Sequence, residues 1–380
     1  MQMTADGSLR PTRTDTLTAQ QTAHLLAACP GVCIEPRPDP QPGAHLKHDL
    51  VWGDYYRIQK TWARDADLRF RAATGGTLSA LAIHLLNSNK VDFVLHVGAD
   101  PEQPMRSRSS MSENPQQVIA NSISRYGPTS PLVDFEQALQ RNQPFALIAK
   151  PCDLNAVARL AKIDDRVDRL CLYRLCMVCG GQSKLRKSWN VIAEHGLDES
   201  EVSVFRYRGY GNPGKIRIES CDGRAWEHSY MSFWEDESSW DVETRCKFCP
   251  DALGEAADIA AADYWPGGNP VAEDAGFNFV ISHTQCGESL LNDAIDTGDL
   301  VAGEDLDIDQ INDAQPHQLR KKQAVLARIE GLDLAGLCTL DAPGYRLQQL
   351  DKALTAEQRE HQQQGVVERV KQGRIREQLP

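Results

Sequence analysis

The sequence predicts a mixed α/β (α+β) fold, and three observations support this prediction. Short apolar runs of strand length, such as 93–97 and 145–149, alternate with segments of helix length. The chain has 380 residues, of which 41% are apolar and 25% charged, enough to enclose a sizeable core. No apolar run approaches the roughly 20 residues of a membrane helix, so no membrane span is expected.

The elements are expected in a simple order along the chain. Residues 1–16 are polar and expected to be disordered, 17–28 form a short helix, and Pro36, Pro38, Pro40 and Pro42 mark an extended linker. The pattern then predicts a helix at 77–88, a strand at 91–97, a polar stretch at 99–114, and helices at 115–121 and 133–141. A strand at 145–149 runs into a helix, and an apolar segment follows at 171–179. The last predicted elements are a hairpin of 202–207 with 215–219, a strand and helix within 276–300, and a helical, charged tail from 317.

Charge and the N-terminus narrow the functional classes. The formal net charge is −12, and such a field repels phosphate backbones, so nucleic acid is not an expected partner. The first residues show no basic-then-apolar signal pattern, and we therefore expect a cytoplasmic protein.

The cysteines are the most informative residues. Eleven occur in a chain without an export signal, which favours metal ligation or redox chemistry over disulfides. Cys176 with Cys179 and Cys246 with Cys249 form two Cys-x-x-Cys pairs, and Cys152 ends a predicted strand. Proline after Cys249 is typical of iron–sulfur motifs. An iron–sulfur centre, a structural zinc site and inert buried thiols all stay open from the residues alone.

The other cysteines carry less information. Cys29 and Cys33 have a spacing that fits neither a ferredoxin triplet nor a zinc pair. The remaining four are expected to be small buried hydrophobic residues: Cys171, Cys221, Cys286 and Cys338.

Two glycine-rich turns are candidate anion sites. Thr74-Gly75-Gly76 opens a helix, where Thr74 can cap the first turn and free amides can hold a phosphate; an ordinary capped helix start is the alternative. The segment 209–214 matches G-x-G-x-x-G, but Pro213 interrupts it and a strand follows, so we predict a hairpin loop instead of a dinucleotide fold.

Ordered motifs across residues 51–320 resemble those of the coenzyme F420 hydrogenase/dehydrogenase beta-subunit family. The matching pieces are Arg69-Phe-Arg-Ala-Ala-Thr74-Gly75-Gly76, Lys90-Val-Asp-Phe-Val, Ser124-Arg-Tyr-Gly-Pro128, Lys150-Pro-Cys-Asp153, Cys179-Gly-Gly-Gln-Ser183, Arg206-Tyr-Arg-Gly209, Arg245-Cys-Lys-Phe-Cys-Pro-Asp251 and the run 257–265. Such an ordered set is more specific than any single motif.

The resemblance implies an iron–sulfur flavoprotein similar to 7-hydroxymethyl chlorophyll a reductases. It implies a mixed-sheet, FAD-binding core with an inserted iron–sulfur loop region, and one [4Fe-4S] cluster on Cys152, Cys179, Cys246 and Cys249, with Cys176 as a possible substitute for Cys179. It further implies flavin contacts at Thr74, Gly75, Gly76, Arg125, Tyr126, Gly127, Lys150, Arg206, Arg208 and Gly209. No catalytic proton donor is assigned.

The resemblance also organises the chain and its function. The expected parts are an extension at 1–50, a flavin-binding part at 51–142, a catalytic and iron–sulfur part at 143–316 and a helical tail at 317–380. The implied activity passes electrons from a ferredoxin-like donor or a partner oxidoreductase subunit to a small organic substrate, in the direction of reduction. One alternative is a non-catalytic electron-transfer subunit whose charged tail, with Val366, Val367, Val370 and Ile375 on one helical side, forms a docking helix; a solvated or oligomer-forming helix is the other interpretation of that tail. Another alternative is a zinc-stapled binding protein without redox activity.

Overall fold

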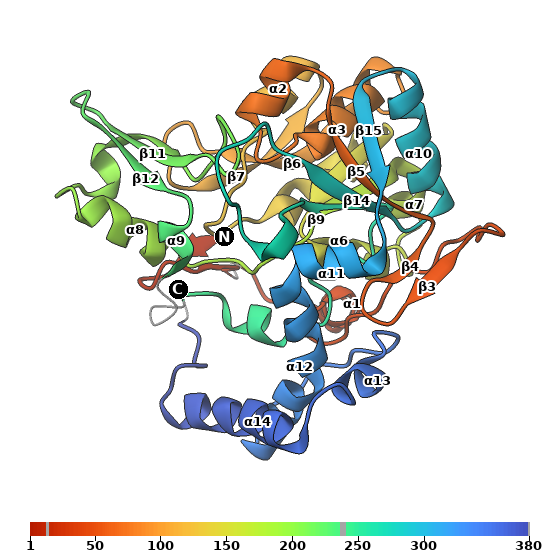
Figure 1. Cartoon of the computed structure of the whole chain (residues 1–380). Coiled ribbons are helices and arrows are strands. Elements are labelled where there is room, and N and C mark those ends of the chain that lie inside the picture. The colour runs from red at the N-terminus through yellow and green to blue at the C-terminus, as the bar shows by residue number, and fades with distance from the viewer. Residues whose placement is uncertain (13–14, 236–240, 379–380) are drawn as a thin grey trace.

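An eight-stranded mixed sheet forms the centre of the molecule (Figure 1). The computed structural model describes residues 1–12, 15–235 and 241–378. The fourth to seventh strands across the sheet run parallel to one another, and the strands on either side of them are antiparallel to their neighbours. In spatial order the strands are β15 (Leu300–Asp305), β5 (Arg57–Ala63), β14 (Asn278–Ser282), β13 (Ile259–Asp263), β9 (Cys171–Met177), β8 (Phe145–Ala149), β6 (Phe93–Ala99) and β7 (Ser107–Ser112).

Helices cover both faces of this sheet because the buried strands are apolar on both sides. On β8, Ala146 and Ile148 face one layer while Phe145 and Leu147 face the other. The first layer contains α2 (Ala66–Arg71), α3 (Thr77–Asn87), α4 (Pro115–Ala120) and α10 (Gln285–Asp296). The second layer contains α5 (Phe135–Gln140), α6 (Pro151–Leu160), α7 (Arg166–Leu170), α11 (Ile308–Ala314), α12 (Pro316–Leu334) and α13 (Leu347–Asp351).

Smaller units surround the sheet. A three-stranded sheet packs on α8 (Leu185–Ala193) and consists of β10 (Val202–Arg206), β11 (Lys215–Ser220) and β12 (Ala225–Ser229). The last helix, α14 (Ala356–Lys371), packs on α12 below the body (Figure 1). The remaining elements are β1 (Gln2–Met3), β2 (Leu9–Arg10), α1 (Ala19–Ala28), β3 (Lys47–Asp49), β4 (Gly53–Tyr55), α9 (Ser232–Glu235), and the 3₁₀ helices η1 (Pro131–Asp134), η2 (Glu199–Glu201), η3 (Thr244–Phe248) and η4 (Pro266–Gly268). Within the described residues, no helix is long and apolar enough to cross a membrane.

Most predicted elements are confirmed, including the hairpin at the glycine-rich loop, where β10 and β11 pair antiparallel. The prediction of disorder at 1–16 is wrong for residues 1–10, which form a two-stranded hairpin with Thr4, Asp6 and Ser8 buried. A tertiary contact orders this segment, because the Leu185 N–H donates to the Gly7 carbonyl (2.7 Å). The polar stretch 99–114 also contains an unpredicted strand, β7.

The edge of the sheet where the parallel strands end brings distant segments together. β13, β9, β8 and β6 share one direction, so their carboxyl ends meet at one edge. Lys150 follows β8, Cys179 lies two residues after β9, and Asp263 ends β13. Ligand sites in open α/β sheets lie at this edge. The fold therefore places these residues where a site is expected.

Candidate functional site

Four cysteines line one cavity at this edge of the sheet. Cys152, Cys179, Cys246 and Cys249 all contribute to its wall, and its volume is about 210 Å³. They come from three separate chain segments, so only the fold brings them together. The structure thus groups the four thiols that the resemblance implied as cluster ligands.

Local structure positions each thiol. Cys152 is the second residue of α6, directly after β8. Cys179 follows β9, and its N–H donates to the carbonyl of Ala252 (2.8 Å). Cys246 lies in η3 and Cys249 caps its end, so a tight turn presents both to the cavity. The Gln182 N–H donates to the Cys246 sulfur (3.4 Å), the kind of bond that tunes a metal-bound thiolate.

Cys176 does not line this cavity. It is fully buried in the core beneath α6, on the face of β9 that packs with Ala260 and Leu147. Gly254, at φ +96°, passes directly over its sulfur, and a side chain there would collide with it. The structure accordingly assigns Cys176 to the core and leaves Cys179 as the member of that pair that faces the cavity.

Positive charge surrounds the thiols. Lys150, Arg245 and Lys321 line the same cavity. Burial opposes the charge on Arg245, but the negative charge that Cys152, Cys249 and Cys246 carry as thiolates outweighs burial and raises the pKa of Arg245. Four thiolates around a metal centre carry a large negative charge, and these cations are placed to compensate it.

Burial raises the pKa of the Cys249 thiol to about 12, and it also raises the pKa values of Cys152 and Cys179. These thiols are therefore neutral without a metal, and binding one releases their protons. Among the residues that the structure describes, no three His, Cys, Asp or Glu side chains converge on a single ion.

A buried arginine network lies at the same edge of the sheet. Arg208 is 1% exposed, and its guanidinium donates to Asp263 (2.8 Å) and to the Thr74 hydroxyl (2.9 Å). Burial opposes its charge, but Asp263 outweighs burial and holds the pKa of Arg208 above its ordinary value. Two aromatic rings stack against its guanidinium, Tyr230 at 4.6 Å and Trp265 at 5.2 Å.

The turn at 124–129 joins the arginine network to the cavity. The Tyr126 hydroxyl accepts from Arg208 (3.4 Å), while the Tyr126 carbonyl accepts from the Ser183 N–H (3.0 Å), four residues after Cys179. Thr129, at the end of this turn, lines the cavity and accepts from the Lys150 ammonium (2.7 Å). Motifs far apart in the sequence thus form one continuous structure.

The predicted cap at Thr74 is wrong. The N-cap of α3 is Gly76, at φ +73°, without a side-chain cap, and Thr74 instead donates its hydroxyl proton to Asp263. Tertiary contacts therefore engage the side chain that local rules assigned to the helix. Gly75 lies against Asn278 of β14, whose side-chain oxygen accepts from the Thr77 N–H (3.2 Å).

The other predicted flavin contacts are engaged mainly by the chain itself. Arg125 donates to the Ser107 hydroxyl and to three backbone carbonyls, and Gly127 lies against the Tyr207 hydroxyl. Gly209 lies against the backbone of Arg71. Arg206 differs, because its guanidinium covers Tyr210 (4.1 Å) while its Nε has no hydrogen-bond partner among the described residues. Contacts of these residues with a flavin stay predictions.

Sequence reasoning missed several residues of the site and misplaced some cysteines. Arg10, Lys321 and Asp251 line the cavity without belonging to the predicted set. A signal existed for Asp251, which follows Cys249 by two positions. The burial predicted for three cysteines is wrong, because each lies in a turn, a first helical turn or a loop and is exposed: Cys221, Cys286 and Cys338. Cys171 is buried as predicted.

The fold and cavity together define a mixed α/β protein with a four-thiol centre at the carboxyl edge of its sheet. Two family models match the chain, both described as "Coenzyme F420 hydrogenase/dehydrogenase, beta subunit". The model of the N-terminal part matches residues 58–135, and the model of the C-terminal part matches residues 143–306. The chain belongs to this coenzyme F420 hydrogenase/dehydrogenase beta-subunit family, which confirms the resemblance.

Individual relatives are distant. The chain is 22% identical to a coenzyme F420 hydrogenase subunit beta from Methanococcus voltae, over 74% of this chain and 99% of that protein. It is 26% identical to an F420-dependent formate dehydrogenase 1 subunit beta from Methanococcus maripaludis, over 63% of this chain and 59% of the relative. It also matches a coenzyme F420-dependent sulfite reductase from Methanocaldococcus jannaschii at 23% identity, over 57% of this chain and 34% of that protein.

A solved structure shares the fold. A chain of the F420-reducing [NiFe] hydrogenase complex from Methanosarcina barkeri superposes with a TM-score of 0.60 at 15% identity, covering 78% of this chain and 99% of that one. At this identity the likeness concerns the fold alone.

Proposed function

We propose that the chain is an oxidoreductase subunit that exchanges electrons through one [4Fe-4S] cluster on Cys152, Cys179, Cys246 and Cys249. The observation that carries the proposal is that these four thiols, from three chain segments, line one cavity. Soft sulfur ligands favour iron–sulfur centres, and a bound cubane supplies one-electron transfer. The relatives named above are hydrogenase, dehydrogenase and reductase proteins, which supports the oxidoreductase class.

The chain's own residues would hold and tune that centre. Lys150, Arg245 and Lys321 supply positive charge at the cavity wall, which favours the more negative, reduced state of a bound cluster. The N–H of Gln182 bonds to the Cys246 sulfur, and such bonds act in the same direction. All four cysteines are partly buried in the wall of the cavity.

The finer part of the proposal is a second, two-electron cofactor. The family resemblance implies FAD, and the relatives are named for coenzyme F420. A flavin or deazaflavin couples single electrons to a small organic substrate, and reduction of that substrate by electrons from a ferredoxin-like donor is the proposed direction. The predicted contact residues donate mainly within the protein.

A second candidate is a non-catalytic electron-transfer subunit. Two of the relatives are named as beta subunits of larger enzymes, which favours a role that requires a partner chain. Purification from the native host distinguishes a reductase that acts alone from an electron-transfer subunit. Turnover of an organic acceptor by the isolated chain supports the reductase, and turnover only with a stoichiometric partner supports the subunit role.

Electron paramagnetic resonance tests the proposal. The protein is prepared anaerobically and its spectrum recorded before and after dithionite. We expect a paramagnetic signal of a reduced cluster, and its loss in Cys179→Ser. Acid-released flavin, measured by fluorescence, tests the FAD component separately. Absence of any iron-dependent signal in reduced wild-type protein would contradict the cluster, and flavin-free active protein would contradict FAD.

A further inference from the structure

We infer that the mouth of the cysteine cavity is a docking surface for an acidic one-electron carrier protein, an inference that rests on the proposed function. The surface is formed by five cations that we call the basic collar: Arg245, Lys247, Lys321, Arg369 and Arg374. It combines the cysteine loop with the C-terminal helices.

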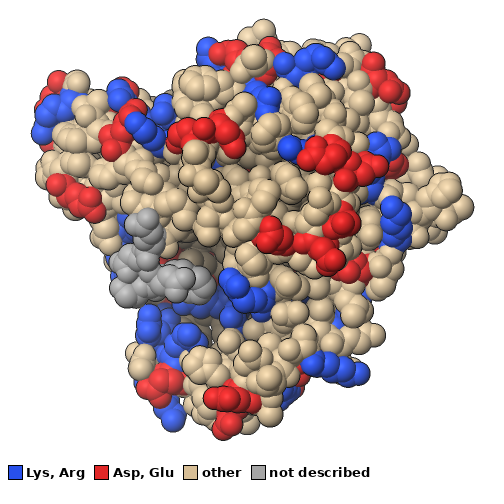
Figure 2. Space-filling model, viewed as in Figure 1, with Lys and Arg blue, Asp and Glu red and all other residues tan. Residues whose placement is uncertain are grey.

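The collar residues lie together around the cavity. Arg245 and Lys321 line the cavity itself, and Lys247 follows Arg245 in η3. Phe248, the residue after Lys247, packs with Val366 and Val370 of α14, and the Thr244 hydroxyl donates to the Ile375 carbonyl, so the segment that carries Arg369 and Arg374 lies against the cysteine loop. Figure 2 shows Lys and Arg atoms gathered round a hollow between the C-terminal helices and the rest of the molecule.

Ion pairs within the described part of the chain do not involve the collar, although Asp153 acts on Arg245 and Asp241 acts on Lys247 at longer range. None of its five residues forms an ion pair with a described carboxylate, whereas the neighbouring acids are already paired. Glu243 and Glu377 both bind Arg10, and Asp241 binds Arg186. A local positive surface on a chain with net charge −12 needs a specific reason, because the overall field repels acidic partners.

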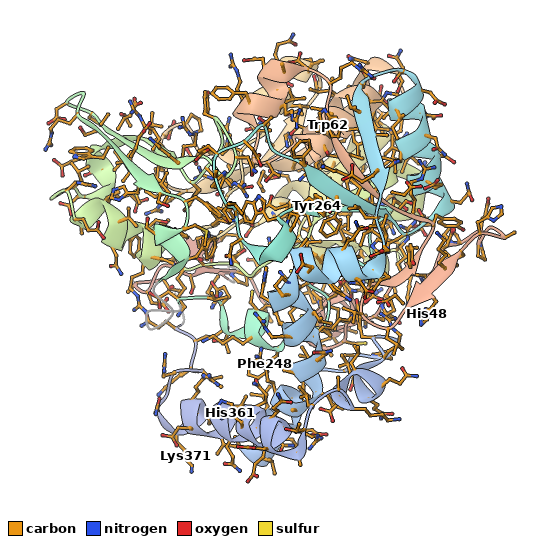
Figure 3. The ribbon with its side chains drawn as sticks, viewed as in Figure 1. His48, Trp62, Phe248, Tyr264, His361 and Lys371 are labelled. Atoms are coloured by element: carbon orange, nitrogen blue, oxygen red, sulfur yellow. The ribbon has the colours of Figure 1, made fainter. Side chains whose placement is uncertain are left out.

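Packing holds the tail against the cysteine loop. Phe248, next to Cys249, is buried against Leu332 and Val366, and Figure 3 shows Phe248 between the body and α14. The Thr244 hydroxyl also donates to the Ile375 carbonyl (3.5 Å). The apolar side of α14, which the sequence suggested as a docking or oligomer helix, is therefore covered by this chain, and its charged side remains exposed.

The tail lies outside the residues that the family models match, which end at 306. Arg369 and Arg374 therefore lie outside the residues that the family models match. They extend positive charge from the cavity wall to the surface, where it meets an approaching protein first.

The chemistry of the partner follows from charge and from the site behind it. Surface charge of one sign steers a partner of the opposite sign and accelerates its association. A carrier that docks there would give up one electron and be oxidised by one unit, and a cluster held by the cavity cysteines would accept that electron and be reduced by one unit. An acidic iron–sulfur carrier has both the negative charge and the one-electron chemistry that this surface requires. A nucleic acid has the negative charge alone, so the binding experiment includes it as a competing ligand.

Binding tests the inference without relying on turnover. The probe is an acidic plant-type [2Fe-2S] ferredoxin that carries a fluorescent dye, titrated with the iron-loaded full chain and followed by anisotropy. The collar variant is Arg369→Glu with Arg374→Glu, both exposed in the tail and away from the cysteines in sequence. Duplex DNA and a basic cytochrome c serve as comparison probes.

The matched control reverses two other exposed tail lysines, Lys352→Glu with Lys371→Glu, so the net charge changes equally. Lys371 lies about 200° around α14 from Arg369, and Figure 3 shows it on the side of the helix away from Phe248. Lys352 follows α13, at the opposite end of the tail from the collar (Figure 1).

We expect ferredoxin to bind at roughly 20 mM salt and to be released at roughly 300 mM, since collar charges are screened. The collar variant should bind about tenfold more weakly, and the control variant within about twofold of wild type. Equal binding by the collar variant, equal losses in both variants, or preference for DNA or cytochrome c would overturn the inference. Iron-free wild-type protein would instead overturn the proposed function on which the inference rests.

Discussion

Gln315 and Gln318 each hold a backbone carbonyl at the carboxyl edge of the sheet. The Gln315 amide donates to the carbonyl of Asp263 (2.9 Å), and the Gln318 amide donates to the carbonyl of Cys179 (3.0 Å). Asp263 ends β13 and Cys179 follows the adjacent strand β9. One turn at the start of α12 therefore connects the arginine network with the cysteine cavity.

Replacing Gln318 should loosen the cysteine site. Gln318→Met keeps the volume but leaves the buried Cys179 carbonyl without its donor, which costs about 1–3 kcal/mol of unfolding free energy. We expect faster loss of iron to a chelator as well as lower stability in urea. Gln323→Ala, on the same helix, is the control. Iron release and urea midpoints equal to those of wild type would contradict the positioning role.

Substitution of cysteines should separate the cavity from the core. Cys152→Ser, Cys179→Ser, Cys246→Ser or Cys249→Ser removes a soft ligand, and each should lose most of its iron. Cys176→Ala should keep its iron, since Cys176 lies in the core and outside the cavity wall. Iron is measured by a colorimetric assay after reconstitution. If Cys179→Ser kept all of its iron while Cys176→Ala lost iron, Cys176 and not Cys179 would be the ligand.

A buried ion network fixes the tail to the cysteine loop. Glu255 binds Lys322 of α12 and Arg346 (2.6 Å), while its N–H and that of Gly254 donate to Asp251 of the cavity wall. Glu255→Gln leaves Lys322 buried and unpaired, so we expect a loss of about 3–5 kcal/mol. The double variant with Lys322→Met should lose less than the sum of the single changes. Urea unfolding measures the free energy of unfolding of the two single variants and the double variant. Strictly additive losses of this free energy would contradict the network.

Buried His96 should make stability depend on pH. Burial lowers the pKa of His96 to about 4 from an ordinary 6.5, and its Nε2 lies 2.7 Å from the Ser112 hydroxyl. On acidification the unfolded chain binds a proton at His96 before the folded chain does. The stability that depends on a neutral His96 is therefore complete above pH 6.5 and is lost as the pH falls towards 4. It amounts to about 3 kcal/mol. His96→Gln should flatten the profile in this window, and an unchanged slope would contradict it.

Local patterns predicted the elements with strong periodicity, and long-range contacts explain the rest. Helix 77–88 and strand 145–149 have clear apolar patterns and are confirmed as α3 and β8. β7 reads Ser-Arg-Ser-Ser-Met-Ser, with no apolar alternation, and is a strand because it pairs with β6 at the sheet edge. The N-terminal hairpin likewise depends on Leu185, far along the chain.

In the candidate site, too, local patterns predicted some residues and long-range contacts place the others. Spacing and family motifs predicted the four cysteines that line the cavity, but they left Cys176 as a substitute for Cys179, because only the fold shows that Cys176, on β9, faces the core. The capping rule assigned Thr74 to its own helix, whereas Arg208 and Asp263 engage it in the fold. Lys321 carried no motif signal and enters the cavity only through the packing of α12.

The central claim is that the four cavity cysteines hold an iron–sulfur cluster. The most direct measurement is the iron, sulfide and zinc content per chain of anaerobically purified protein, taken with its visible spectrum before and after dithionite. We expect about four irons and four sulfides per chain and a broad band near roughly 400 nm that bleaches on reduction. A colourless protein that holds zinc in place of iron would contradict the claim.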